Sequence, residues 1–299
     1  MHARSPARLR LLLPLLLATA TAPARAAILV SSVSSFGGSF SSNNLIDEDS
    51  HLARFTIQTR GWLANGPDGA IYEARGFQVY RIDPDDGSST IFVSAGTSLA
   101  GITFGPAGDL WVSDATGGQI LRYDGVTGAP LGSGPSVASP GALRFGPGGD
   151  LYVASLATDS VHRFDGTTLA PLGTIGAGLG IDRPLGLTFG PGGDLYVSSE
   201  AGEDVRRFDP DTGALIGVVA AFAAGTQPGG LVFGPDGDLY VAARGDSLFT
   251  VLLYGGVHQV DPATGTILAT FGKDGARSAF DLVFNDAFGA HPGEARVGP

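Results

Sequence analysis

The 299-residue chain has no cysteine, few charged residues and, beyond residue 26, no long apolar run. The absence of cysteine excludes disulfide bonds and thiol chemistry, so stability must come from apolar burial and backbone hydrogen bonds. Charged residues make up only 16% of the chain, whereas glycine occurs 47 times, which favours short strands and tight turns over long solvated helices. We expect no membrane-spanning helix in the segment after residue 26.

Residues 1–26 have the pattern of a secretory signal peptide. The basic stretch MHARSPARLR precedes the apolar stretch LLLPLLLATA, and Ala24-Arg25-Ala26 supplies small residues for cleavage. An uncleaved anchor is the alternative, although the apolar run is short for a bilayer span. The sequence therefore predicts a secreted or periplasmic protein that begins near residue 27.

Basic residues are scarce. The whole chain has a net charge of −11, and loss of the four leader arginines leaves 14 basic against 29 acidic residues, a net charge of −15. Because an acidic surface repels phosphate, nucleic acid is not expected as a partner. Solubility is the simplest explanation of the acidity.

A glycine-rich stretch recurs along the chain. FGPGGDLYV at 189–197 is matched by FGPAGDLWV at 104–112, FGPGGDLYV at 145–153 and FGPDGDLYV at 233–241. The first glycine of each G-P-x-G turn, with a fifth at Gly66, recurs at intervals of 39, 41, 44 and 44 residues. This period indicates repeated supersecondary units, each beginning with strand, turn and strand.

A second motif follows each glycine-rich stretch. It is typified by Val205-Arg206-Arg207-Phe208-Asp209, whose apolar and polar residues alternate as in a half-buried strand. The D-x-x-T-G turn comes next, and then a fourth short strand such as Ala214-Leu215-Ile216-Gly217. Four antiparallel strands in about forty residues are typical of a β-propeller blade.

Hairpin geometry alone explains both turn motifs. Proline presets φ at the first corner, and glycine takes the positive φ that reverses the chain. A phosphate-binding role would need a helix after the loop, whereas D-L-Y-V favours a strand. Calcium binding at the D-P-D-T-G turns is a weak alternative, because each turn offers few side-chain oxygens. No cofactor is predicted.

The repeat predicts an all-β, six-bladed propeller over residues 27–285, followed by a tail at 286–299. Five units cover about 62–100, 101–140, 141–183, 184–227 and 228–278. We expect the sixth blade to combine Phe280–Phe284 with the N-terminal segment, because Ile28–Ser32 resembles a second strand and 44–57 a hairpin. Such closure would hide the edge strands and stop the ring from fraying.

The repeated G-L-x-F-G-P-x-G-D-L-Y-V and V-x-R-F-D-x-x-T-G motifs resemble those of NHL-repeat and SMP-30/gluconolactonase-like six-bladed propellers, and more weakly those of streptogramin lyase. The likeness covers essentially all of the mature chain. It implies the architecture but does not name a function, because such blades occur in lactonases, lyases and binding modules.

The resemblance implies tests for an enzyme. An SMP-30-like metal site would use an Asn where this chain has Leu185 and Gly229, and acids after the second strands, where only Asp114 fits. A lyase-like site would need a histidine base at the channel mouth. His162 and His258 share one repeat position and are interpreted as strand-surface residues, and His51 and His291 as residues of polar segments.

Candidate binding residues lie on the face where the longer connections should meet. We predict a ligand-contacting set at this channel mouth: Asp114, Glu200, Arg244, Asp246, Phe249 and Tyr254. The last two belong to an apolar insertion at 247–254, which either covers the mouth or packs on a neighbouring blade. No metal site and no catalytic set stands out.

The sequence therefore predicts a secreted binding module for a protein, glycan or small molecule. The rival prediction is a lactonase-like or streptogramin lyase-like enzyme that acts at the same mouth. Convergence of three or more acidic, Asn or His side chains there would favour the enzyme.

Overall fold

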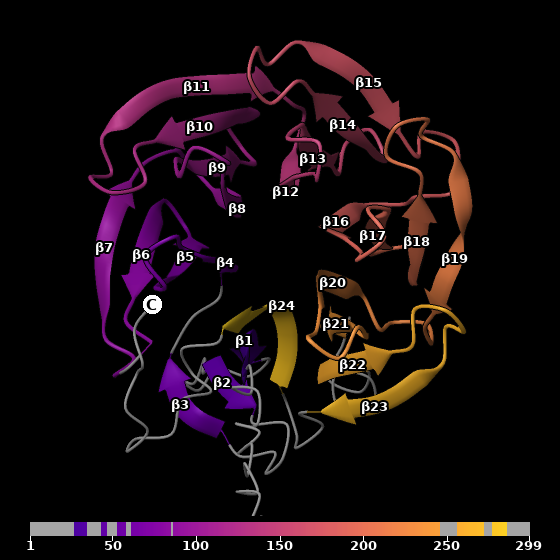
Figure 1. Cartoon of the computed structure of the whole chain (residues 1–299). Coiled ribbons are helices and arrows are strands. Elements are labelled where there is room, and N and C mark those ends of the chain that lie inside the picture. Colours follow the sequence, from indigo (N-terminus) through magenta and orange to yellow (C-terminus); the bar gives the residue numbers. More distant parts are fainter. Residues whose placement is uncertain are drawn as a thin grey trace, which may run out of the picture.

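The computed structural model describes residues 27–34, 43–46, 53–57, 61–84, 86–245, 256–271 and 277–285. These residues form four-stranded antiparallel sheets arranged around a central axis, as Figure 1 shows. The prediction of an all-β propeller with four-stranded blades is confirmed. The predicted leader 1–26 and tail 286–299 lie outside the described residues.

Five blades follow the sequence repeat, each running from an inner to an outer strand. Their strands are β4 (Trp62–Asn65), β5 (Ile71–Arg75), β6 (Gln78–Ile82) and β7 (Ser89–Ser94); β8 (Leu99–Phe104), β9 (Leu110–Asp114), β10 (Gln119–Tyr123) and β11 (Pro130–Ser136); β12 (Pro140–Phe145), β13 (Leu151–Ser155), β14 (Ser160–Phe164) and β15 (Pro171–Ile175); β16 (Pro184–Phe189), β17 (Leu195–Ser199), β18 (Asp204–Phe208) and β19 (Leu215–Ala221); β20 (Pro228–Phe233), β21 (Leu239–Ala243), β22 (Gly256–Val260) and β23 (Ile267–Phe271). We call them blades 1 to 5.

A further sheet joins the two ends of the chain. Its order is β24-β1-β2-β3, with β24 (Arg277–Asn285), β1 (Ala27–Ser34), β2 (Asn43–Ile46) and β3 (Ala53–Ile57). β1 pairs antiparallel with β24, so that Ile28 lies opposite Phe284 and Leu29 opposite Val283. Figure 1 shows this sheet between blade 5 and blade 1.

Blades 1 to 4 each pack on the next blade through an aromatic pair. The aromatic residue of D-L-Y-V or D-L-W-V, replaced in blade 1 by Tyr72 of A-I-Y-E, contacts edge to face the phenylalanine that precedes the next G-P-x-G turn. Ring centroids are 4.8 Å apart for Tyr72 and Phe104, and 5.0 Å apart for Tyr152 and Phe189. Trp111 with Phe145 and Tyr196 with Phe233 repeat the arrangement. Such pairs stabilise beyond the area they bury, so one motif fixes both the strand and its neighbour.

Small residues on the inner strands allow neighbouring blades to approach closely. A Cβ at Gly101 would lie 2.4 Å from the carbonyl oxygen of Gly141, and one at Gly186 would lie 2.3 Å from that of Gly229. Neither contact is sterically possible, so these glycines are required by blade packing rather than by ligand chemistry. Ser198 Oγ also donates to the Gly229 oxygen at 2.7 Å, which links blades 4 and 5.

Asp281 departs from this pattern of small residues. It lies on the inner strand β24, is 0% exposed, and accepts a hydrogen bond from Leu63 N of blade 1 at 2.8 Å through Oδ2. Its Oδ1 has no hydrogen-bond partner among the described residues. Burial raises the pKa of Asp281 to about 6, although the positive charge of Arg144 acts in the opposite direction. The contact therefore joins β24 to blade 1 at the cost of a buried charge.

We expect Asp281→Asn to stabilise the protein at neutral pH. Because the folded-state pKa of about 6 exceeds the ordinary 3.8, the parent should lose stability as pH rises from about 4 to about 6, and stay at the lower level above that. The amide keeps an acceptor for Leu63 N without the charge, so the gain should be roughly 2–3 kcal/mol at neutral pH. Urea unfolding at about pH 4.5 and 7.5 measures it.

The exposed Asp182→Asn is the matched control, and it should leave stability unchanged. A D281N protein that is no more stable than the parent at about pH 7.5 would show that ionised Asp281 is fully compensated by Arg144.

Candidate functional site at the channel mouth

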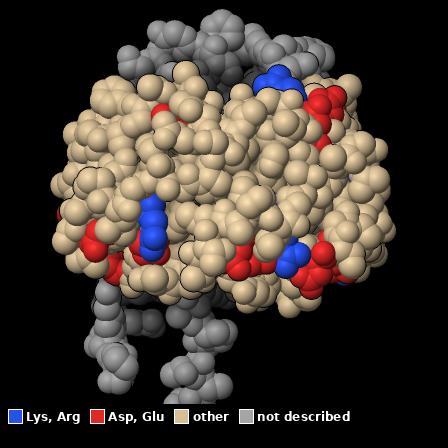
Figure 2. Space-filling view, turned by 90° about the horizontal axis from the view of Figure 1, so that it is seen from above, with Lys and Arg blue, Asp and Glu red and all other residues tan. Residues whose placement is uncertain are grey.

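The two faces of the propeller differ in their connections. The G-P-x-G and D-x-x-T-G hairpins lie together on one side, which we call the turn face. The connections from second to third strand, and from one blade to the next, lie on the other side, which we call the mouth face. Figure 2 views the rim between them, where uncharged residues predominate and acidic and basic residues lie beside one another toward the edges.

On the turn face the repeated motifs hold the hairpins. Gly193 N bonds to Gly190 O at 2.9 Å and Gly193 takes φ +89°, as the turn interpretation requires. Asp209 Oδ1 accepts from the amides of Asp211 and Thr212 at 2.9 and 2.8 Å. These amide hydrogen bonds, that of Thr212 first, lower the pKa of Asp209.

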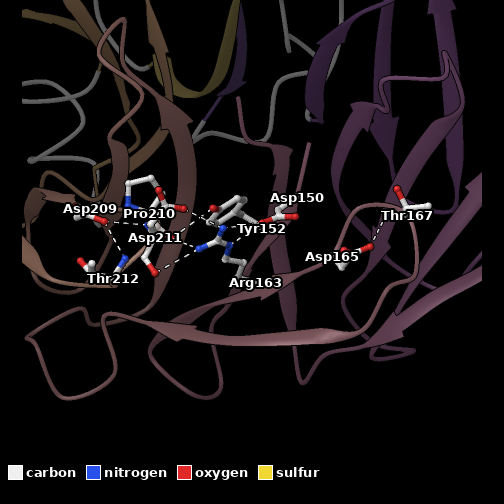
Figure 3. A network of polar contacts seen from close by, with 9 residues as sticks. All are labelled: Asp150, Tyr152, Arg163, Asp165, Thr167, Asp209, Pro210, Asp211 and Thr212. Atoms are coloured by element: carbon white, nitrogen blue, oxygen red, sulfur yellow. Dashed lines mark hydrogen bonds and ion pairs between the residues drawn. The ribbon is translucent and has the colours of Figure 1, made fainter. Parts of the chain in front are cut away.

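An arginine joins these hairpins to the neighbouring blade (Figure 3). Arg163 pairs with Asp150 at 2.7 Å and lies over the Tyr152 ring, 5.6 Å from its centroid. The same guanidinium donates to Pro210 O at 2.8 Å and pairs with Asp211 at 3.0 Å in blade 4. These charged residues of the turn face therefore hold blade 3 against blade 4.

The mouth face holds a cavity of about 490 Å³ at the ring axis. All five repeat blades contribute to its wall: Trp62, Leu99, Ala100, Ala115, Ser139, Pro140, Gly141, Leu156, Ala157, Arg183, Leu185, Glu200 and Arg244. The first residue after the second strand lines it in four blades, as Ala115, Leu156, Glu200 and Arg244. This one repeat position makes the wall apolar at blades 2 and 3 and charged at blades 4 and 5.

The charged part of the wall is a carboxylate between two guanidinium groups. The side chain of Glu200 is 4% exposed, and its Oε1 forms an ion pair with Arg244 Nη2. Its Oε2 lies 3.3 Å from Arg183 Nη2, close enough for an ion pair but without hydrogen-bond geometry. Burial, and then the charge of Arg183, lower the pKa of Arg244. Two positive charges and one negative charge thus meet at the edge of the cavity.

Backbone contacts fix Arg183 in place. Its N donates to Asp159 Oδ1 at 2.9 Å, and its φ is +53°, immediately before Pro184. Ser139 and Gln227 occupy the equivalent positions before Pro140 and Pro228, with φ of +43° and +51°. The left-handed conformation is therefore a property of the blade connection, and what differs at blade 4 is the arginine side chain.

Asp114, predicted as a mouth residue, is instead enclosed by backbone. It is 2% exposed, and its carboxylate accepts from Thr97 N, Thr97 Oγ1, Ser98 N and Gly117 N at 2.8–3.1 Å. Burial raises its pKa, but these hydrogen bonds outweigh burial and lower it overall. Ser155 and Ser199 hold the corresponding connections in blades 3 and 4. In blades 2, 3 and 4 this position thus anchors the chain entering the blade, and we leave Asp114 out of the proposed site.

The other predicted residues divide into two groups. Glu200 and Arg244 line the cavity. Asp246, Phe249 and Tyr254, with the 247–254 insertion, lie outside the described residues. The sequence interpretation missed Arg183 and Trp62. A signal for Arg183 was present, since it stands before a proline where sibling blades have Ser139 and Gln227.

The described histidines lie away from the cavity. His162 Nε2 is 3.1 Å from Thr158 Oγ1, and burial lowers the His162 pKa. His258 Nδ1 is 3.0 Å from Thr270 Oγ1. His51 and His291 lie outside the described residues. Within the described ranges, no three His, Asp or Glu side chains gather as metal ligands. No helix in the same ranges could span a membrane.

Comparison with known proteins shows the fold. No family model and no curated protein matches the sequence. Among solved structures, a chain of a nidogen/laminin complex has a TM-score of 0.67 at 17% identity, covering 87% of this chain and 98% of that one. A proposed 6-phosphogluconolactonase from Bacteroides fragilis has 0.60 at 18%, covering 88% and 99%. Virginiamycin B lyase from Staphylococcus aureus, solved with quinupristin, has 0.58 at 15%, covering 83% and 85%.

These likenesses define the class as a β-propeller of four-stranded blades. They agree with the resemblance read from the repeated motifs. At such identities they transfer no activity and no ligand to this chain.

We expect Asp114→Ala to destabilise the fold by about 2–4 kcal/mol, because several buried donors lose their acceptor. Asp114→Ser should cost less, since serine serves this position in blades 3 and 4. Because the folded pKa is lowered, the contribution of Asp114 is present above the ordinary pKa of 3.8 and is lost as pH falls through the lower folded value. Urea unfolding measures all three proteins, and equal stability of Ala and Ser variants would contradict the anchoring role.

Proposed function

We propose that this protein is a binding module whose ligand enters the mouth cavity. The observation that carries the proposal is the composition of the cavity wall, which combines apolar side chains with a charged cluster centred on the buried Glu200. Cavities of about 300–1,000 Å³ with mainly apolar walls and a few placed polar groups are the usual sites for small ligands. The cavity of about 490 Å³ fits that description. A small molecule therefore suits it better than a glycan or a folded protein partner.

An enzyme of lactonase or lyase type is the second candidate, favoured by the fold likeness. Of the described residues in the cavity wall, Glu200 is the only acid, and two arginines hold its carboxylate. A general base needs a carboxylate or imidazole that can take up a proton from the reacting group. Glu200, as held, serves binding better than proton transfer.

We propose further that the working protein is an exported six-bladed ring. Export rests on the composition of residues 1–26 and is tested by N-terminal sequencing of the mature protein. Ring closure is supported by the β1 and β24 register, in which residues 27–34 pair with residues 277–285. A closed ring would hold the blades around the cavity at fixed distances.

Narrowing the cavity should weaken ligand binding. Ala115→Phe places a ring at the repeat position that forms the wall, and we expect binding of an anionic aromatic probe, anilinonaphthalene sulfonate, to fall at least fivefold. Probe fluorescence measures it. Val126→Phe, on an exposed hairpin of the turn face, is the control and should bind like the parent. If both variants bind equally, the probe does not occupy the cavity.

Because the chain has no cysteine, a single introduced pair can test the ring. Val30 and Leu282 are opposite one another in the β1–β24 register, so the Val30→Cys, Leu282→Cys double variant should form a disulfide under mild oxidation. The Leu29→Cys, Leu282→Cys pair is one residue out of register and places the thiols on opposite faces. Mass spectrometry should find the bond only in the first variant; bonding in neither would disprove the proposed closure.

A further inference from the structure

We infer that the mouth cavity selects a small molecule that carries a single carboxylate on an apolar body. This inference rests on the proposed binding function and adds the chemical class of the ligand. It follows from the charges at the cavity edge, from the donors that Arg183 can offer, and from the state of the other acids on the mouth face.

The charge balance of the wall favours an anion. The lining residues include two arginines, Arg183 and Arg244, and one acid, Glu200, which forms an ion pair with each of them. The Glu200 side chain is 4% exposed and Arg244 is 27% exposed, whereas Arg183 is 56% exposed. An entering ligand therefore meets Arg183 first.

Arg183 has donors to offer. Its guanidinium carries five N–H groups. The side-chain contact described for it is the 3.3 Å ion pair with Glu200, which lacks hydrogen-bond geometry. A carboxylate can accept two parallel hydrogen bonds from one guanidinium, which is the stronger mode of pairing. Its fixed backbone, with N bonded to Asp159, keeps this donor at the cavity edge.

Three further described acids on the mouth face already have partners, and a fourth lies outside the cavity wall. Asp114 is enclosed by backbone amides, as described above. Glu203 accepts from Gly225 N at 2.8 Å and Gln227 N at 2.7 Å, and Asp204 pairs with Arg206 at 2.7 Å. Asp182, next to Arg183, is exposed and is not part of the cavity wall. A cation would thus find one carboxylate flanked by two arginines, which is an unfavourable site.

The apolar side chains of the wall favour a ligand whose body, apart from the carboxylate, is apolar. Trp62, Leu99, Leu156 and Leu185 line the same cavity as the charged cluster. A carboxylate held at Arg183 would leave an apolar group of aromatic-ring size to cover these side chains and displace water from them. Ligands with charges at both ends would have to leave one charge against this wall, which costs free energy.

The test uses three probes of nearly equal size: 4-phenylbutyrate, its primary amide, and 4-phenylbutylamine. The chain has two tryptophans, Trp62 in the cavity and Trp111 in blade 2. Trp111→Tyr places the residue that blades 3 and 4 have at this position, and makes Trp62 the sole tryptophan reporter. Titration of Trp62 fluorescence then reports the cavity directly.

We expect the carboxylate to bind at least tenfold more tightly than the amide, and the amine to bind more weakly still. Arg183→Gln should reduce carboxylate affinity at least tenfold and leave amide affinity unchanged. Gln227 shows that glutamine adopts the required φ at this position. Glu200→Gln should raise carboxylate affinity, because it removes the competing charge.

Arg207→Gln is the matched control. It removes the same charge on the turn face, where Gln259 already takes the equivalent place beside Asp238 in blade 5. It should leave all three affinities unchanged. An equal loss in R183Q and R207Q would mean that net charge, and not a site, attracts the probe.

The outcomes separate the two proposals. Equal binding of carboxylate and amide would overturn the carboxylate inference and leave the binding function standing. If the amine binds most tightly and this binding is lost in Glu200→Gln, the cavity is a cation site and the carboxylate inference is wrong. No change in Trp62 fluorescence with any probe would overturn both.

Discussion

Edge-to-face packing between one blade's second strand and the next blade's first strand is the constraint on which the rest depends. The aromatic of D-L-Y-V and the phenylalanine of F-G-P-x-G belong to a single motif, yet they meet across a blade boundary, as Tyr152 and Phe189 do. Each repeat therefore contains one aromatic residue that contacts the next blade and one phenylalanine that contacts the previous blade. Because the inner strands must then come close, glycine is required where Gly186 faces Gly229, and the spacing of the blades around the axis follows.

That spacing creates the cavity and decides what lines it. The first residue after the second strand lines the cavity in blades 2 to 5. Ala115, Leu156, Glu200 and Arg244 differ in size and charge at one structural position. The neighbouring position, Asp114 in blade 2, Ser155 in blade 3 and Ser199 in blade 4, hydrogen-bonds the connection that enters its blade. Of these two adjacent positions, the one earlier in the chain holds the blade connection and the later one lines the cavity. The residue at the later position differs between blades that share one fold.

Charged side chains have different kinds of partner on the two faces of the propeller. On the turn face, arginine and aspartate pair across blades, as Arg163 does with Asp150 and Asp211. On the mouth face, Asp114 and Glu203 accept backbone amides instead, and the exposed Arg183 has Glu200 as its described ion-pair partner. A chain with an overall charge of −11 can therefore present a locally positive cavity edge. Net charge describes solubility and long-range attraction, while the site depends on which charges are already used.

The sequence by itself determined the strands, the turns and the blade period, because these depend on local alternation and on glycine, proline and aspartate at turn positions. It also pointed to Glu200 and Arg244 as residues of the face where the longer connections meet. Only the tertiary structure decided that Asp114 is enclosed, that Arg183 pairs with Glu200, and that Trp62 lines the same cavity. These facts depend on residues from separate blades meeting at one axis, and such distances are set by packing between blades and not by the pattern within any one of them.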